Sequence, residues 1–159
     1  MIALPSLKRL TQRIPSVQHG QSLGDVMRIF TRYPAIRAIV VLDGDFPLGV
    51  ICRDLIADVA GLPCYSAWID REGCLQFVSH PACLLCVDAD AADLAQVLAP
   101  ATYWHPAEPV VVVADGVYLG IVEREALIGA IAAEQQRTLD VMSRLVSKLA
   151  TDRGSKIKH

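Results

Sequence analysis

Two short stretches of the chain place a glycine, two apolar residues, an arginine and a carboxylic acid in the same order. The first reads Gly-Val-Ile-Cys-Arg-Asp from Gly49 to Asp54, and the second reads Gly-Ile-Val-Glu-Arg-Glu from Gly120 to Glu125. In each stretch an apolar step typical of a strand leads into helix-forming residues. The first turn of a helix carries free backbone N–H groups and partial positive charge, which suits the binding of an anion.

Arg53 and Arg124 hold equivalent places at the start of these two helices. One interpretation is that they contact an anion such as a nucleotide phosphate. The other is that they are solvated and pair with Asp54 or Glu125, or with the other half of the chain. Because the helix dipole disfavours a cation in the first turn, something must compensate for it. Asp54 and Glu125 are either first-turn acids that suit the dipole or acceptors for ribose hydroxyls.

Both stretches belong to a longer internal repeat. Residues 34–49 read PAIRAIVVLDGDFPLG and residues 106–120 read PAEPVVVVADGVYLG. Each copy contains Pro-Ala, a β-branched apolar run, Asp-Gly and a later glycine, on which we align them. A repeat of this length indicates a tandem architecture. We therefore expect two units related by a pseudo-two-fold axis, with clefts between them.

Apolar spacing and turn residues predict the same order in each copy: strand, helix, strand, strand, helix. In the first copy the expected elements are an extended piece at 14–17, a helix capped by Ser22 with Asp25 in its first turn, strands at 36–42 and 48–52, and a helix at 53–60 ended by Gly61. In the second they are an extended piece at 83–87, a helix capped by Asp90, strands at 109–114 and 118–122, and a helix from about 123. The predicted fold class is α+β.

The repeat divides the chain into six segments. They are an N-terminal segment 1–11, a first repeat 12–61, a connector 62–80, a second repeat 81–133, a C-terminal helical extension 134–150 and a tail 151–159. We expect the tail to be disordered. A loop before the second hairpin carries Tyr103, Trp104 and His105. These side chains either stack on a base or pack the loop onto the core or a dimer interface.

Composition argues against several classes of function. The chain has 159 residues, is 53% hydrophobic and carries a net charge of -2, so we expect no binding to nucleic acid or to an anionic membrane surface. No apolar run approaches the ~20 residues of a membrane span, and the first residues lack the pattern of a signal peptide. Five cysteines, an odd number, favour reduced thiols and a cytoplasmic location.

Cys83 and Cys86 form a Cys-x-x-Cys pair near three further ligand types, Cys64, Cys74 and His80. A zinc site is one interpretation of this cluster. We favour small buried hydrophobic residues instead and predict no metal site. The pair falls in a predicted strand, where residues three apart face opposite sides and the thiols diverge.

Nothing in the chain predicts a catalytic centre. The histidines at 19, 80 and 105 lack a partner serine, cysteine or acid at motif spacing, so no catalytic triad can be argued. A Gly-rich phosphate loop of the Walker type is also absent from the sequence. We therefore expect a protein without enzymatic activity.

A heptad pattern runs through the C-terminal part of the chain. Residues on alternating steps of four and three are Ile128, Ala132, Gln135, Leu139, Met142, Val146 and Leu149. This spacing predicts an amphipathic helix whose seam either packs on its own domain or mediates self-association. We favour a homodimer to which this helix contributes, or a connector to an effector or signalling domain.

A duplicated β-α-β-β-α unit with a Gly-apolar-apolar step into its last helix resembles the CBS domain pair, often called a Bateman module, over about residues 12–133. The hairpins VVLDGDFPLGVI and VVVADGVYLGIV carry this resemblance most specifically. The run from Pro47 to Arg53 is also similar to a pattern in CBS-like modules upstream of bacterial cyclic-di-GMP signalling domains.

The resemblance implies a non-enzymatic regulatory module that senses a small ligand between its repeats, an adenosine-containing one such as AMP, ADP or ATP. It relays the signal through dimer geometry. The alternative is a structural dimerisation or interaction module with degenerate, empty clefts. The implied site residues are Cys52, Arg53, Asp54, Arg124 and Glu125.

The sequence departs from the motif of nucleotide-binding CBS units, which is Gly-h-h-Thr/Ser-x-x-Asp with the hydroxyl on phosphate and the acid on ribose. The hydroxyl position is Cys52 in one copy and Glu123 in the other. Asp54 and Glu125 come one residue early, which rotates them by about 100° on a helix. Because Glu123 would repel a phosphate, we expect two unequal clefts, and the one flanked by Cys52 and Arg53 is the better candidate.

Overall fold

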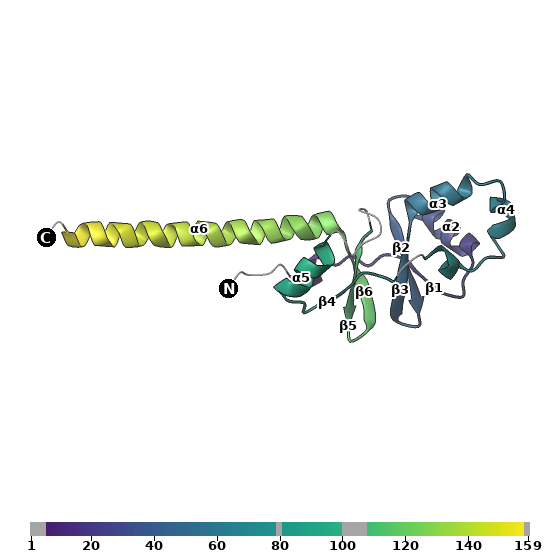
Figure 1. The fold of residues 1–159 in the computed structure, drawn as a ribbon, viewed down its shortest axis with the longest axis horizontal. Coiled ribbons are helices and arrows are strands. Elements are labelled where there is room, and N and C mark those ends of the chain that lie inside the picture. Colours follow the sequence, from purple (N-terminus) through teal and green to yellow (C-terminus); the bar gives the residue numbers. More distant parts are fainter. Residues whose placement is uncertain (1–5, 79–80, 100–107, 158–159) are drawn as a thin grey trace.

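The computed structural model describes residues 6–78, 81–99 and 108–157 and contains the expected unit twice (Figure 1). Repeat 1 consists of β1 (Ser16–Gln18), α2 (Leu23–Arg32), β2 (Ala38–Asp43), β3 (Phe46–Cys52) and α3 (Arg53–Ala60). Repeat 2 consists of β4 (Leu84–Cys86), α5 (Ala91–Leu98), β5 (Val110–Ala114), β6 (Val117–Val122) and α6 (Arg124–Ile157). The short helix α1 (Leu7–Leu10) precedes repeat 1, and α4 (Tyr65–Trp68) and the 3₁₀ helix η1 (Cys74–Phe77) connect the repeats. The predicted α+β fold is confirmed.

Each repeat forms a three-stranded sheet with the strands in chain order. The first strand of each sheet runs parallel to the second, and the second runs antiparallel to the third. A parallel pair needs a crossover connection, which α2 supplies in repeat 1 and α5 in repeat 2. The antiparallel pairs are the two predicted hairpins.

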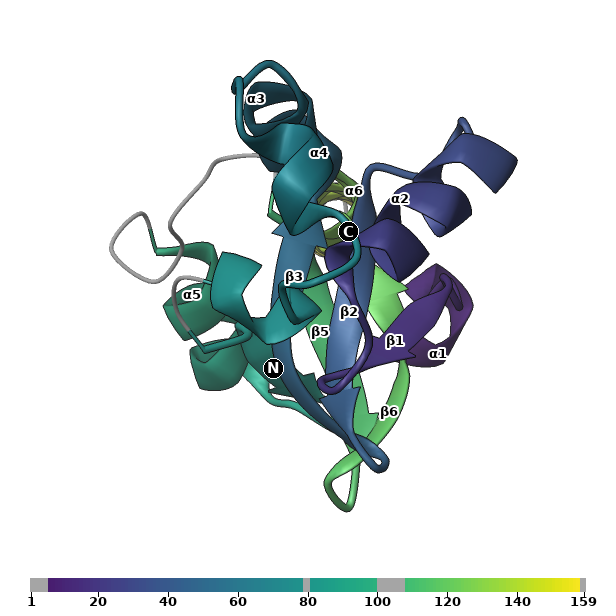
Figure 2. The same cartoon turned by 90° about the vertical axis from the view of Figure 1, so that its right-hand side faces the viewer.

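The alternation of side chains along the strands divides the core into three parts. Ile39, Val41 and Ile51 pack with helices α2 and α3 in repeat 1. The equivalent core of repeat 2 lies between its sheet and helices α5 and α6. The opposite faces of both sheets, which carry Val40 and Val111, pack against each other in a third cluster. The sheets therefore lie back to back, with the helices on the outside (Figures 1 and 2).

The register of the strands aligns the two copies one residue differently from the alignment on Asp-Gly. Val41 lies opposite Gly49 in repeat 1, and Val112 lies opposite Gly120 in repeat 2. Val41 is thus equivalent to Val112, whereas alignment on Asp-Gly matches it with Val113. That part of the predicted alignment is wrong, because a shift of one residue in a strand turns each side chain to the other face.

The corner residues of the two hairpins differ for the same reason. They are Gly44 and Asp45 in repeat 1, and Asp115 and Gly116 in repeat 2. Gly44 has a φ of 61°, and Asp115 and Gly116 have φ values of 50° and 78°. Asn, Asp and Gly are the residues that accept such left-handed backbone in a two-residue hairpin turn. Only the first corner residue has positive φ in repeat 1, whereas both corner residues do in repeat 2, so the two Asp-Gly pairs serve different two-residue turns at positions one residue apart.

Reciprocal caps start the first helix of each repeat, at the predicted cap residues Ser22 and Asp90. The backbone N–H of Asp25 donates to Ser22 Oγ at 3.3 Å, and the backbone N–H of Ser22 donates to Asp25 Oδ2 at 3.1 Å. Asp90 and Asp93 exchange the same pair of bonds at 2.9 and 3.2 Å. Each box satisfies two backbone donors that the helix itself leaves unpaired.

The segment before each repeat crosses the last strand of a repeat at a glycine. Gln12 and Ile121 exchange two backbone hydrogen bonds of 2.8 Å, and a Cβ at Gly120 would lie 2.5 Å from Gln12 O. In repeat 1 a Cβ at Gly49 would lie 2.1 Å from Val78 Cγ1. The glycine shared by both copies is thus required for a close crossing. As a consequence Leu7, which precedes repeat 1, is buried in the core of repeat 2.

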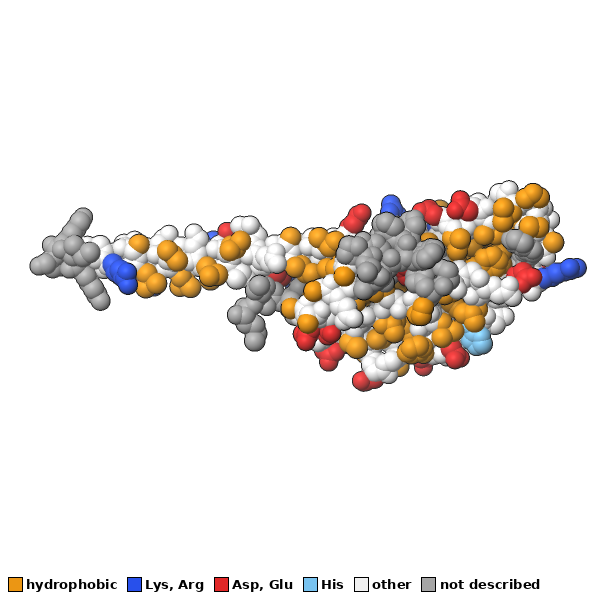
Figure 3. All heavy atoms as spheres, in the orientation of Figure 1, with side chains coloured by type: hydrophobic (Ala, Val, Ile, Leu, Met, Phe, Trp, Pro, Cys, Tyr) orange, Lys and Arg blue, Asp and Glu red, His pale blue; other side chains and the backbone are white. Residues whose placement is uncertain are grey.

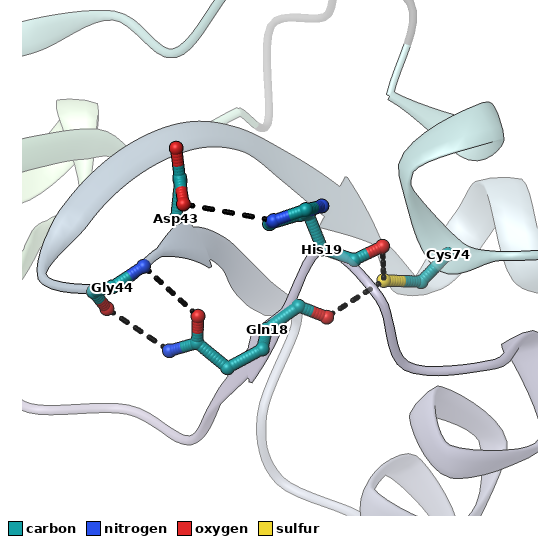
Figure 4. A network of polar contacts seen from close by, with 5 residues as sticks. All are labelled: Gln18, His19, Asp43, Gly44 and Cys74. Atoms are coloured by element: carbon teal, nitrogen blue, oxygen red, sulfur yellow. Dashed lines mark hydrogen bonds and ion pairs between the residues drawn. The ribbon is translucent and has the colours of Figure 1, made fainter.

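The connector is ordered where the structure describes it and packs on repeat 1. Figure 4 shows Cys74 Sγ directed at the carbonyl oxygens of Gln18 and His19, at 3.4 and 3.8 Å. The Gln18 side chain bonds to both backbone groups of Gly44, at 2.9 and 3.0 Å, and His19 Nε2 lies 3.6 Å from Asp43 Oδ1. These contacts join the end of β1, the first hairpin and the connector.

Helix α6 is the most extended element and projects far beyond the sheets (Figure 1). Its first turns pack on repeat 2 through the buried Leu127 and the half-buried Ile131. The helix continues to Ile157, so the expected disorder from residue 151 is wrong over 151–157. This stretch contains no proline, and Gly154 alone costs only about 1 kcal/mol of helix propensity. In the described part of the chain, we find no helix with the length and apolarity of a membrane span.

Candidate ligand-binding cleft

A cleft of ≈ 530 Å³ lies between the repeats. Three segments line it: residues 12–14 before β1, residues 35–38 at the start of β2, and residues 121 and 123–125 where β6 passes into α6. A cavity of this size falls within the range of about 300–1,000 Å³ that is common for small-molecule sites. Both repeats contribute walls, so a ligand there would contact both.

Two exposed arginines, the buried Arg124 and two glutamates give the cleft a mixed charge. Arg13 and Arg37 are exposed on the side of repeat 1, and Glu123 and Glu125 come from the start of α6. Burial raises the pKa of the half-buried Glu123 carboxyl above its usual value. The nearby Arg37 lowers this pKa, and Glu125 raises it further. The cleft therefore contains cations able to hold phosphate and a carboxylate whose charged form is disfavoured.

Arg13 is held at the cleft by an aromatic ring. Its guanidinium carbon lies 5.6 Å from the centroid of Tyr118, a cation–π distance. The Tyr118 hydroxyl donates a hydrogen bond of 3.2 Å to the carbonyl oxygen of Ile14. The buried Tyr118 comes from β6, so repeat 2 helps to position an arginine that precedes repeat 1.

Arg53 is turned away from this cleft. Its Nε donates to Ile36 O at 2.7 Å, and its Nη2 donates to Tyr33 O at 2.8 Å and to Phe30 O at 3.1 Å. The guanidinium carbon also lies 4.6 Å from the Phe30 ring centroid. Phe30 and Tyr33 are at the carboxyl end of α2, where partial negative charge favours a cation.

Arg124 makes the equivalent contacts in repeat 2. It is buried, its Nε donates to Glu108 O at 2.9 Å, and its Nη1 donates to Val97 O near the end of α5. In both repeats, therefore, the arginine of the last helix binds carbonyls at the end of the first helix. These carbonyls supply the compensation that we expected for a first-turn cation.

Cys52 lies among carboxylates. Burial raises the pKa of its thiol to about 11, and the nearby Glu108, Asp54 and Glu123 raise it as well. The thiol is therefore protonated at neutral pH. A phosphate beside Cys52 would meet the negative charge of these three side chains.

The cleft contains only two of the five predicted site residues. Arg124 and Glu125 line it, whereas Cys52, Arg53 and Asp54 do not. Arg53 instead lines a smaller cavity of ≈ 280 Å³ between α2 and α3. The preference for the cleft beside Cys52 stays a prediction, since residues 79–80 and 100–107 lie outside the described part of the chain. The aromatic cluster at 103–105 and the histidine at 80 also lie outside the described residues.

Arg13 and Arg37 are not among the site residues predicted from the sequence. Arg37 directly precedes β2, and Arg13 lies just before β1. Because β1 and β2 run parallel, their amino ends meet at the same edge of the sheet. Two arginines just before two strands that a helix joins, an arrangement typical of a parallel pair, are the signal that would have identified them.

The cysteines differ widely in burial. Cys74 is buried, Cys52 and Cys83 are half-buried, and Cys64 and Cys86 are exposed. The expectation of small buried residues is thus wrong for Cys86. Within residues 6–78, 81–99 and 108–157, the structure brings together no group of three His, Cys, Asp or Glu side chains that could hold a metal.

Comparison with known proteins identifies the fold. Residues 7–60 match the family model of the CBS domain. A CBS domain-containing protein from Bacillus anthracis str. Ames Ancestor is similar with a TM-score of 0.63 and 22% identity, over 83% of this chain and 95% of that chain. A CBS domain-containing protein from Kribbella flavida is similar with a TM-score of 0.63 and 12% identity, over 82% and 99%.

The CBS domain of a bacterial CNNM/CorC family Mg²⁺ transporter, solved in complex with ATP, is similar with a TM-score of 0.63 and 17% identity, over 81% of this chain and 87% of that chain. No curated protein matches the chain. At these identities the likeness to solved structures establishes the fold. Residues 7–60 thus resemble a CBS domain in sequence, and the chain as a whole has the fold of a CBS domain pair. The narrower similarity to modules upstream of cyclic-di-GMP signalling domains stays a prediction.

Proposed function

We propose that this CBS domain pair is a non-enzymatic regulatory module that senses an adenine nucleotide, or a related ligand, in the cleft between its repeats. The observation that carries the proposal is the composition of the ≈ 530 Å³ cleft, which Arg13 and Arg37 line together with Glu123 and Glu125. We also place the protein in the cytoplasm, because its five free cysteines are compatible with a reducing compartment.

The charged groups divide between the parts of a nucleotide. Arg13 and Arg37 are exposed, so their guanidinium groups remain available for phosphate, with which arginine forms paired, charge-assisted hydrogen bonds. Glu125 is an acceptor for the ribose hydroxyls. Arg124 has a structural role, because its guanidinium is buried and binds the carbonyls of Glu108 and Val97.

Glu123 determines the orientation in which a nucleotide binds. Its carboxylate repels a phosphate placed at the start of α6, where phosphate binding would otherwise be favoured. The phosphates therefore lie toward Arg13 and Arg37, on the side of repeat 1. Neutralising Glu123 removes this repulsion and tightens the binding of phosphate.

A ligand in this cleft acts on the whole molecule through α6. The helix begins at Arg124, inside the cleft, and continues to Ile157 as one element. A ligand that contacts both repeats favours one relative orientation of them, and a continuous helix carries this change to a dimer partner or an effector domain. A neighbour of similar fold was solved with ATP, which supports the choice of ligand class.

Titration calorimetry of the full chain with AMP, ADP and ATP tests the proposal. We expect saturable binding of at least one of them to the wild-type protein. Arg37→Ala should weaken it about tenfold, which corresponds to about 1.4 kcal/mol. Arg28→Ala is the control, because Arg28 pairs with Asp25 on α2, outside the residues that line the cleft. Absence of binding, extended to S-adenosylmethionine and cyclic dinucleotides, would reject the nucleotide proposal.

A structural dimerisation module with empty clefts is the second candidate. Glu123 in the cleft and the carboxylates around Cys52 favour it, because both disfavour phosphate. This candidate predicts a dimer whose thermal stability does not respond to any of these ligands. Thermal unfolding with and without each ligand separates the two candidates.

A further inference from the structure

The outer part of α6 presents an apolar surface without a covering element in the described chain. From Leu139 to Gly154 every residue is exposed, and the large apolar side chains at 139, 142, 145, 146 and 149 are 56–65% exposed. Figure 3 shows hydrophobic side chains along this helix. An isolated helix of about 15 residues is only marginally stable in water, so this part of α6 needs a partner.

The apolar residues form one continuous face. Leu139 and Val146 alternate with Met142 and Leu149 at heptad spacing, and Leu145 widens this seam on one side. A seam of this kind packs against another helix with the same spacing. The α6 helix of a second copy of this chain has the same spacing, because its sequence is identical.

Charge along α6 is divided between its two halves. From 125 to 140 the sequence has three acids, Glu125, Glu134 and Asp140, against Arg137. From 141 to 157 it has four basic residues, at 144, 148, 153 and 156, against one aspartate. The helix dipole accounts only for charges in the first and last turns. The dipole therefore does not explain why the net charge changes from negative to positive in the middle of the helix. A partner helix of complementary charge does explain it.

Arg153 decides between the two orientations of such a pair. It occupies the next seam position after Leu149, four residues on. In a parallel, in-register pair Arg153 of each copy would face its equivalent in the seam, and the basic halves would lie together. In an antiparallel pair Arg153 lies near Glu134 and Gln135 of the second copy. Glu134 then exchanges or shares its ion pair with Arg137 on its own helix.

We propose that α6 pairs antiparallel with α6 of a second copy of this chain, with the centre of the overlap between Arg144 and Leu145. The overlap then covers residues 132–157 of both helices, about 39 Å in length at 1.5 Å per residue. Leu139 and Met142 of one copy lie near Leu149 and Val146 of the other. The two CBS domain pairs sit at opposite ends of this helical rod.

The mass of the full chain in solution, measured by sedimentation equilibrium, is the first test. We expect a dimer for the wild type and a monomer for Met142→Glu, which places a charge in the seam. Ser147→Glu is the matched control: it adds the same charge on the opposite face of the helix and should remain dimeric. Circular dichroism of both variants shows whether the domains stay folded. A monomeric wild type would overturn the proposal.

Spin-label distances test the orientation. Ala133→Cys and Ser147→Cys are labelled separately in full-length protein that also carries Cys64→Ser and Cys86→Ser, which removes the exposed thiols. In the antiparallel pair the two labels at 133 are about 35 Å apart along the axis and those at 147 only about 8 Å apart. A parallel pair gives similar, short distances at both sites, and that result would overturn the proposal.

Charge reversal gives an independent measure of the orientation. Arg153→Glu alone should weaken the dimer about tenfold, because the new carboxylate lies near Glu134 of the second copy. Adding Glu134→Lys should restore the affinity in the antiparallel pair. In a parallel pair two glutamates at 153 still face each other, so failure of the double variant to recover would count against the proposal.

Discussion

The guanidinium groups of Arg53 and Arg124 show how one residue type at a helix start can serve structure. Each donates to carbonyls near the end of the first helix in its own repeat. Arg53 donates to the carbonyl oxygens of Ile36, Tyr33 and Phe30. This one side chain therefore joins α3 to α2 and to the segment before β2. The equivalence of the two arginines is visible in the sequence, but their acceptors are backbone atoms that no sequence pattern marks.

Arg53→Met should destabilise repeat 1 by about 2 kcal/mol, because it removes charged hydrogen bonds to three carbonyls at once. Arg53→Lys should recover little, since an ammonium group cannot reproduce the fork of the guanidinium. Urea unfolding followed by circular dichroism measures both. The matched control is Arg28→Ala, whose exposed ion pair with Asp25 should contribute less than about 0.5 kcal/mol. An Arg53→Met variant as stable as this control would contradict the structural role.

Glu123 makes the stability of the fold depend on pH. Its pKa in the folded protein is raised above the ordinary 4.5, chiefly by burial. A raised pKa means that its favourable contribution is complete below pH 4.5 and is lost as the pH rises through the folded value. Glu123→Gln should therefore match the wild type at low pH and become the more stable protein toward pH 7.

Thermal unfolding across this pH range checks the prediction. Glu125→Gln is a second test, because Glu125 is exposed, lies in the cleft and raises the pKa of Glu123. Removal of this neighbouring charge should lower the pKa of Glu123, so the pH-dependent loss of stability should move to lower pH. A Glu123→Gln variant that is less stable than the wild type at pH 7 would show that the attraction between Glu123 and Arg37 outweighs the cost of burial.

At the scale of elements, local signals were sufficient wherever a single segment decides the structure. The caps at Ser22 and Asp90 start α2 and α5 as predicted, and α3 covers residues 53–60 as predicted. The hairpins were also predicted, but their alignment was wrong by one residue. Both copies contain Asp-Gly, yet the turn begins at Gly44 in one and at Asp115 in the other, because the pleat and not the dipeptide sets the register.

Gly120 should be sensitive to the smallest substitution. A Cβ at this position would lie 2.5 Å from Gln12 O and 2.7 Å from Thr11 Cγ2, and the first of these atoms belongs to the backbone. Gly120→Ala should therefore cost about 1–3 kcal/mol, as overpacking does, and loosen the pairing of Gln12 with Ile121.

The control for this substitution is Gly129→Ala in α6, where a Cβ meets nothing within 4 Å. Alanine should stabilise this exposed helical position by about 0.5–1 kcal/mol. Denaturant unfolding of both variants measures the difference. Equal stability of the two variants would show that the crossing at Gly120 is looser than the structure indicates.

At the scale of the whole molecule, the cleft depends on chain crossings. Arg13 precedes β1, Arg37 precedes β2, and Glu123 follows β6, so three distant segments meet. The sequence predicted two repeats with clefts between them, and the fold confirms the two repeats. It placed the site on the last helices alone, because the transferred motif covers only that part. The arginines were missed because their proximity depends on the parallel pairing of β1 with β2 and on the contact between the two sheets.

Nuclear magnetic resonance of the ¹⁵N-labelled full chain shows whether a nucleotide binds in this cleft. Titration with AMP, ADP and ATP should shift the backbone signals of residues 12–14, 35–38 and 121–125 together, with one saturating curve. In Arg37→Ala these shifts should require about tenfold more ligand. Shifts that cluster elsewhere, or no shifts at millimolar nucleotide, would contradict the account.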